Sequence, residues 1–167
     1  RARPLAADYD GTDIYVSLHS NGYQGDCTGT CPTGSETYYD STGGAPTASQ
    51  NLANAINPAI MSAITGNADS TWTCHGVCVK DSAGNYGEIR IPSRAATLTE
   101  IAFHDTCDRD ADADHLRDNF FRSTFTWGMY KGICTYFGVS PTWAFYSDEL
   151  VSHDIPDVFG IAGHVAM

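Results

Sequence analysis

Blocks of apolar and polar positions alternate along the chain and predict strands and helices in turn. Two runs rich in apolar residues, 13–18 and 95–103, predict buried strands, and 35–40 has strand character as well. Apolar residues recur at three- and four-residue steps over 47–64 and 112–137, which predicts two helices, the second being the longest. This alternation indicates one three-layer α/β domain, with a mostly parallel, twisted sheet flanked by helices.

Segments rich in glycine and polar residues separate these elements. The segment 22–34 cannot be regular structure, and 66–94 predicts a long surface excursion with one or two short strands. Pro58 is expected to kink or divide the first long helix. The last helix ends near Gly138, so we expect one folded domain over 1–138 and an extension, 139–167, that packs on it or leads to a further segment.

The composition excludes some classes of partner. The chain has 167 residues, enough for one domain with a core, and a formal net charge of −11. Such a charge repels phosphate backbones and anionic membranes, so nucleic acid is not an expected partner. The sequence holds no leader and no apolar run long enough to span a bilayer, so we expect that any signal peptide has been removed or is not included.

The cysteines form an even set with two close pairs in loops. They are Cys27, Cys31, Cys74, Cys78, Cys107 and Cys134. A zinc knuckle and disulfide bonds are the competing interpretations, and the wide separation of the two pairs favours disulfide-stapled loops. Disulfides imply an oxidising compartment, so we expect a secreted protein, extracellular or periplasmic. The pairing stays open.

Three motifs then resemble zinc-dependent N-acetylmuramoyl-L-alanine amidases. They are DIYVSLHSNG at 13–22, GSETYYD at 34–40 and TLTEIAFHDTCDRDAD at 97–112. They occur in the family's order, and the resemblance extends to about Gly138. It implies the family's fold, lacking its amino-terminal part, and hydrolysis of the amide bond between N-acetylmuramic acid and L-alanine. Peptidoglycan or a related glycopeptide is then the expected partner.

The same resemblance assigns roles to four residues. His19 matches a zinc-ligand position, and a neutral imidazole at a strand end suits zinc. Its structural alternative is a hydrogen bond to a loop carbonyl. Glu100 matches the catalytic carboxylate, with an ion pair to Arg90 or Arg94 as the alternative. Asn21 and Tyr38 are candidate substrate-binding residues, although core packing would equally explain Tyr38.

The sequence departs from the family in its metal ligands. The family's first ligand motif, Gly-His-Gly followed by a ligand Glu, has no counterpart before Arg1. The chain therefore supplies one of the three ligands that catalytic zinc needs, and the expected Zn²⁺ site is incomplete. One alternative is a non-catalytic extracellular binding or assembly module on a degenerate amidase scaffold. Another is that a partner chain or self-assembly covers the sheet edge beside 13–18.

A second departure lies at His104 and Asp105, where many relatives carry a small residue and Asn. These side chains could form a polar corner with Glu100, provided that no bulge interrupts the strand. The alternative is a capping and turn network that leads into the next helix, and the sequence favours it.

Overall fold

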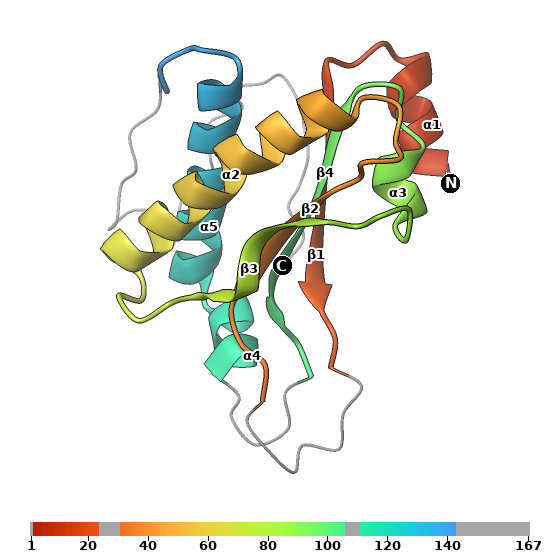
Figure 1. Ribbon diagram of the computed structural model, residues 1–167. Helices are drawn as coiled ribbons and strands as arrows, with labels where there is room; N and C mark the ends of the chain where they lie inside the picture. Colours follow the sequence, from red (N-terminus) through yellow and green to blue (C-terminus); the bar gives the residue numbers. More distant parts are fainter. Residues whose placement is uncertain (1, 24–30, 106–110, 143–167) are drawn as a thin grey trace.

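Four strands form one sheet in the computed structural model, which describes residues 2–23, 31–105 and 111–142 (Figure 1). The strands are β1 (Ile14–Asn21), β2 (Ser35–Tyr39), β3 (Cys74–Asp81) and β4 (Ala95–Phe103), in the spatial order β1-β4-β2-β3. β1 runs parallel to β4 and β2 runs parallel to β3, whereas β2 and β4 are antiparallel. The predicted mostly parallel sheet is confirmed.

Helices cover both faces of this sheet. They are α1 (Ala2–Tyr9), α2 (Pro46–Asn67), α3 (Gly87–Arg90), α4 (Ala111–Arg117) and α5 (Asn119–Tyr136). α2 and α5 lie side by side over one face, while α1 and α3 lie on the other side of the sheet (Figure 1). The three-layer α/β architecture expected from the sequence is therefore confirmed.

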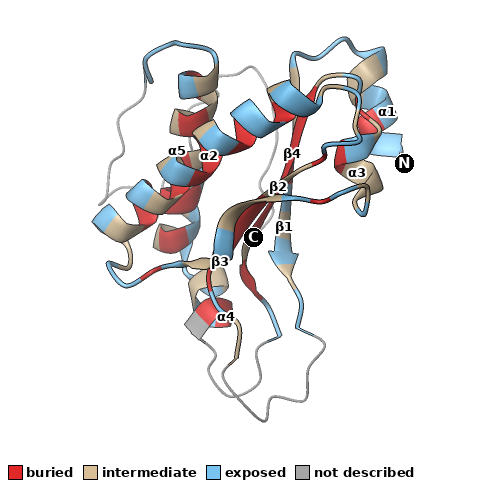
Figure 2. Cartoon of the chain, in the orientation of Figure 1, coloured by how far each residue is buried: buried red, intermediate tan, exposed pale blue. Residues whose placement is uncertain are grey.

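The main core lies between the sheet and the α2–α5 layer. Its largest buried side chains come from both helices, and Figure 2 shows the buried stripe of α2 turned away from solvent. They are Leu52, Ile56, Ile60, Ile64, Phe121 and Phe125. Side chains alternate along each strand. Those of Val16 and Ala95 face the α2–α5 layer, whereas those of their neighbours, such as Tyr15 and Ala96, face α3. The second face holds the smaller cluster of Ile89, Ala96 and Leu98.

α5 approaches α2 closely because two glycines face it. A Cβ atom added at Gly128 would lie 2.6 Å from the Cα of Ile60. One added at Gly132 would lie 2.5 Å from the Cα of Ile56. Real Cβ atoms do not come so near, so the helix spacing depends on both glycines.

The structure corrects three predictions about the helices. The segment 112–137 is two helices, because Asp118 is extended and its carboxylate caps α5 by accepting the Phe120 N–H at 2.9 Å. α2, with 22 residues against 18 for α5, is the longest described helix. α2 also runs on through Pro58, so the predicted division there is wrong. Pro58 has no backbone N–H to donate to the Asn54 carbonyl. Because both residues are exposed, water can bond to that carbonyl instead.

Two further features bear on the site. The excursion 66–94 contains one strand, β3, as predicted, and the short helix α3, which no periodic pattern indicates. β1 lies at an edge of the described sheet, and Leu18 on it is 48% exposed.

Candidate active site

A row of polar side chains crosses the sheet on the face that α3 covers. His19 of β1 is the register partner of Glu100 of β4, and Glu100 is the partner of Glu36 of β2. Register partners on neighbouring strands point to the same face. Tyr38 of β2 and its partner Lys80 of β3 continue the row. The fold thus brings His19 and Glu100 together, as the sequence predicts, and adds a second carboxylate.

Glu100 is buried in this row, and no described residue forms an ion pair with it. The residue is 8% exposed, and its Oε2 atom has no hydrogen-bond partner among the described residues. Burial raises the pKa of Glu100; the charge of His19 opposes this rise, the nearby Glu36 carboxylate adds to it, and His104 opposes it. A carboxylate with raised proton affinity suits general base catalysis.

The arginines proposed as structural partners of Glu100 lie elsewhere. The Arg94 Nε atom is 3.0 Å from Asp8 Oδ1, and Arg90 donates to the Gly84 carbonyl at 2.6 Å. The ion-pair alternative for Glu100 is therefore wrong for both residues.

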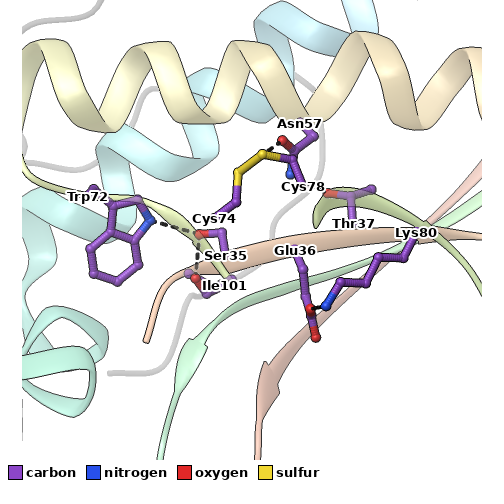
Figure 3. Close-up of a disulfide and its surroundings, with 9 residues drawn as sticks. All are labelled: Ser35, Glu36, Thr37, Asn57, Trp72, Cys74, Cys78, Lys80 and Ile101. Carbon is purple, nitrogen blue, oxygen red and sulfur yellow. Dashed lines mark hydrogen bonds and ion pairs between the residues drawn. A yellow bond between two sulfur atoms is a disulfide. The ribbon is translucent and has the colours of Figure 1, made fainter. Parts of the chain in front are cut away.

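Glu36 is as buried as Glu100 but fully partnered. Asn21 Nδ2 and the Tyr38 hydroxyl donate to its Oε1 at 2.8 and 2.7 Å. The Lys80 ammonium pairs with Oε2, as Figure 3 shows. Asn21 and Tyr38, the predicted substrate-binding pair, therefore converge on one carboxylate that no sequence motif singled out as functional. Burial raises the pKa of the Tyr38 phenol, and the hydrogen bond to Glu36 raises it further.

Aromatic rings line the same face. Tyr86 meets Tyr38 edge to face, with ring centroids 5.0 Å apart, and Tyr15 packs against the cluster of Ile89, Ala96 and Leu98. Burial raises the pKa of Tyr86, and the charge of Glu100 raises it further. The row is thus bordered by amphipathic rings that offer both an apolar face and a hydroxyl.

His19 faces a carboxylate rather than a loop carbonyl. Its Nε2 atom lies 2.9 Å from Glu88 Oε2 and 3.0 Å from Ser17 Oγ. Burial opposes ionisation of Glu88, but hydrogen bonds from Tyr15, Ser17 and His19 outweigh it and lower the pKa of Glu88. No motif in the sequence identifies Glu88, because it lies in a four-residue helix inside a polar excursion.

A disulfide holds β3 in place beside Glu36. Cys74 bonds to Cys78, and between these residues the register jumps from Ser35↔Cys74 to Thr37↔Val79, so a short loop leaves the ladder. Cys74 Sγ lies 3.9 Å from Asn57 Oδ1 (Figure 3). The disulfide closes this loop and returns β3 to the register in which Lys80 faces Tyr38.

A second set of contacts in Figure 3 ties β2 to β4. The Trp72 indole donates to Ser35 Oγ at 2.9 Å, and the Ser35 hydroxyl donates to the Ile101 carbonyl at 2.6 Å. These bonds fix the residue next to Glu36 against the residue next to Glu100.

That the other cysteines form disulfides stays a prediction, and their pairing stays open. Cys134 is buried in α5 and forms no disulfide with a described residue. Cys27 and Cys107 lie outside the described residues.

The ends of β1 and β4 are joined by a turn network. The His104 N–H donates to the Asn21 carbonyl at 3.0 Å, and the His104 ring lies 3.1 Å from Ser20 Oγ. Asp105 Oδ1 accepts the Tyr23 N–H at 2.7 Å. The register shifts between His19 and Asn21, so a bulge does intervene before His104. The contacts of His104 and Asp105 thus run to the end of β1 and to Tyr23. The predicted network into the next helix stays a prediction, because residues 106–110 lie outside the described residues.

The family model for N-acetylmuramoyl-L-alanine amidase (Amidase_3) matches residues 1–135. The chain belongs to this amidase family. A search of curated proteins finds no match.

Solved amidase structures share the fold. An N-acetylmuramoyl-L-alanine amidase of Clostridium difficile 630 is 22% identical, with a TM-score of 0.66 over 82% of this chain and 64% of that one. The catalytic domain of CwlV from Bacillus (Paenibacillus) polymyxa var. colistinus is 25% identical, with a TM-score of 0.63 over 83% and 65%. AmiC2 of Nostoc punctiforme is 19% identical, with a TM-score of 0.60 over 82% and 64%. The chain therefore spans less than two thirds of each relative.

The amidase family is typically zinc-dependent, and His19 is a residue of the type that binds zinc. Imidazole nitrogen is a common zinc ligand, and Glu100, whose Oε2 atom has no partner among the described residues, lies on the neighbouring strand. Over the described part of the chain, however, no group of three or more His, Cys, Asp or Glu side chains could hold a metal ion. Catalytic zinc ordinarily takes three protein ligands, so the others would have to come from outside the described residues.

Within residues 2–23, 31–105 and 111–142, no helix is both long enough and apolar enough to cross a bilayer.

Proposed function

We propose that this chain carries the zinc-dependent amidase activity of its family and hydrolyses the bond between N-acetylmuramic acid and L-alanine in peptidoglycan. The match of the amidase model over residues 1–135 supports the reaction class. The observation that carries the proposal is the pairing of His19 with a buried Glu100 whose Oε2 atom has no partner in the described structure.

Glu100 is the proposed catalytic carboxylate. Its raised pKa allows it to take a proton from the attacking water and return it to the leaving amine. His19 is the proposed metal ligand, and a zinc ion held there would polarise the amide carbonyl and lower the pKa of a bound water.

Asn21 and Tyr38 are the proposed substrate-binding residues. Both are held by Glu36, so their side chains are oriented before substrate arrives. The Tyr38 and Tyr86 rings supply apolar surface that suits a sugar ring, while the Asn21 amide can bind a polar substituent.

The proposed location is outside the cytoplasm, in contact with the cell wall. The Cys74–Cys78 disulfide supports an oxidising compartment. We take residues 1–138 as the catalytic domain and 139–167 as an extension, of which 143–167 lie outside the described residues. The edge position of β1, with its half-exposed Leu18, supports the expectation that a further segment or partner chain covers that edge.

A non-catalytic binding module on the amidase scaffold is the second candidate. The observation that favours it is the ligand set, since the described residues contain no three-ligand group. Such a module would bind peptidoglycan fragments through the tyrosine-lined face without cleaving them.

The test uses the intact protein with purified peptidoglycan and measures newly released L-alanine amino groups together with zinc content. Glu100→Gln should lower the rate by about 10²–10⁴-fold, the usual contribution of a general base. His19→Ala should lose zinc. The exposed carboxylate variant Asp114→Asn is the control and should match the wild type. Full activity in Glu100→Gln would refute the role of Glu100. A zinc-free, inactive wild type that still binds fragments would favour the binding module.

A further inference from the structure

α1 and α3 lie side by side on the same side of the sheet as the row of polar side chains, and their residues line a hollow of about 550 Å³ (Figure 1). The lining consists of residues 3–5 of α1 together with Gly87, Glu88, Arg90 and Ile91. A volume of this size accommodates a small ligand. This α1–α3 hollow adjoins the candidate active site, because Glu88 lines it and the Glu88 Oε2 atom is 2.9 Å from His19 Nε2.

The α1–α3 hollow is positively charged, although the chain as a whole is acidic. Arg3 and Arg90 both line it. The Arg3 guanidinium lies 3.2 Å from Glu88 Oε1, so these two charges offset each other. No described carboxylate forms an ion pair with Arg90. The Arg90 charge is therefore left over in the hollow, in a chain whose formal net charge is −11.

Arg90 is held beside the hollow with hydrogen-bond donors to spare. Its Nη1 atom donates to the Gly84 carbonyl at 2.6 Å, which fixes the guanidinium and leaves its other N–H groups available. Gly87 adds no side chain at this point, and a Cβ atom placed there would lie 3.9 Å from Arg90 Nη2. Arg90 is exposed, so a ligand can reach it. A guanidinium in such a position can bind a carboxylate through two parallel hydrogen bonds.

The rest of the lining favours a small peptide with a single negative charge. Leu5 is 55% exposed and Ile91 is half-buried, so both offer apolar surface beside the charge of Arg90. A phosphate group with two negative charges would be repelled by Glu88 more strongly than a carboxylate with one. The proposed amidase reaction releases a peptide that begins with L-alanine. Because one residue spans about 3.5 Å, the first carboxylate of a short peptide lies close to the bond that is cleaved.

We propose that the α1–α3 hollow binds a carboxylate of the peptide on the leaving side of the cleaved bond, with Arg90 as its main contact. This assignment rests on the proposed function, because that function supplies the peptide. It makes Arg90 a specificity-determining residue, which favours peptides with a free carboxylate over peptides in which the same group is an amide.

The first experiment measures peptide binding to the intact protein through its backbone amide resonances in NMR titrations at low ionic strength. L-alanylglycine and L-alanylglycinamide are the probes, because only the first ends in a charged carboxylate. L-alanylglycine should shift the amides of α1 and α3 and bind about tenfold more tightly than L-alanylglycinamide, the usual effect of a hydrogen bond to a charged group. Added salt should reduce this preference.

Variants of Arg90 test the contact itself. Arg90→Gln should abolish the preference, and Arg90→Lys, which keeps the charge but lacks the planar guanidinium, should retain part of it. Arg117→Gln removes an exposed arginine of α4 and is the matched control, which should bind like the wild type. Equal affinity of the wild type for the two peptides, an unchanged preference in Arg90→Gln, or shifts confined to other elements would each overturn the proposal. Tighter binding of inorganic phosphate at the same amides would overturn it in favour of a phosphate site.

These titrations require neither zinc nor hydrolysis, so they separate this proposal from the proposed function. A protein that does not cleave peptidoglycan but prefers L-alanylglycine would refute the amidase function and support the carboxylate site. In an active protein, Arg90→Gln should raise the KM for a soluble muropeptide about tenfold with kcat unchanged, because the contact is the same before and during the reaction. An unchanged KM would refute the assignment of the hollow to the substrate.

Discussion

Glu36 and Glu100 lie directly opposite each other on the antiparallel strands β2 and β4, and they have opposite environments. Lys80, Asn21 and Tyr38 all bind Glu36, whereas Glu100 Oε2 has no partner among the described residues. Two neighbouring carboxyl groups with different surroundings can take different roles, one structural and one catalytic.

Lys80→Met should destabilise the protein strongly. The Glu36 side chain is only 3% exposed, and loss of Lys80 would leave its charge buried without a counter-ion. The expected loss is about 3–5 kcal/mol in the free energy of unfolding, measured by urea denaturation. Arg117→Met is the control, since it breaks an exposed pair with Asp114 and should change stability by at most about 1 kcal/mol. An equally small loss of stability in Lys80→Met would show that the buried Lys80–Glu36 pair does not stabilise the fold.

Glu100→Gln should stabilise the fold at neutral pH. The folded state raises the pKa of Glu100 above its ordinary value of 4.5, mainly by burial, so ionisation favours unfolding. The stability that the protonated group contributes is fully present below the unfolded pKa and is lost as pH rises through the folded pKa. The gain from Glu100→Gln should therefore be present at pH 7 and absent near pH 4. Denaturation curves at the two pH values measure it; a gain of equal size at both would contradict the assignment.

Gly128→Ala and Gly132→Ala should each destabilise the α2–α5 contact. The added methyl group would overlap the α2 backbone, and overpacking of this kind costs about 1–3 kcal/mol. Gly66→Ala in α2 is the matched control, because nothing lies within 4 Å of its added Cβ atom. There the substitution should stabilise the helix by about 0.5–1 kcal/mol. Thermal unfolding of the three variants measures the change in stability, which should be a loss for Gly128→Ala and Gly132→Ala and a gain for Gly66→Ala.

Replacement of Cys74 and Cys78 by serine should lower stability by about 2 kcal/mol, the loop-closure value for so short a crosslink. Because the crosslinked loop sets the β2–β3 register, amide hydrogen exchange should rise in β3 and around Lys80 more than in β4. A uniform rise over the whole sheet would indicate a global effect instead.

The strongest sequence patterns located the elements well, and the weaker ones did not. Residues 95–103 form β4 as predicted, because an apolar run bounded by polar turns has few alternative conformations. The break at Asp118 could not be predicted, since helical periodicity continues across it and an Asp can cap or occupy a helix.

The candidate site was predictable where a motif carries the chemistry. His19 and Glu100 come from family motifs, and the fold places them in register. Glu88 and Lys80 come from the segment 66–94, for which the sequence predicts a surface segment with one or two short strands but no functional residue. Their partners depend on the β2–β3 pairing and on the position of α3, which are tertiary contacts that no local pattern encodes.

The antiparallel pairing of β2 with β4 also has a kinetic consequence. Because that pairing joins one parallel pair of strands to the other, Glu36 meets Glu100 only after segments far apart in the sequence have closed on each other. Pairings of this kind carry a large loop-closure entropy and form slowly. The row of polar side chains across the sheet should therefore assemble late in folding. During refolding, burial of Glu100 would then report completion of the whole sheet rather than of any one strand pair.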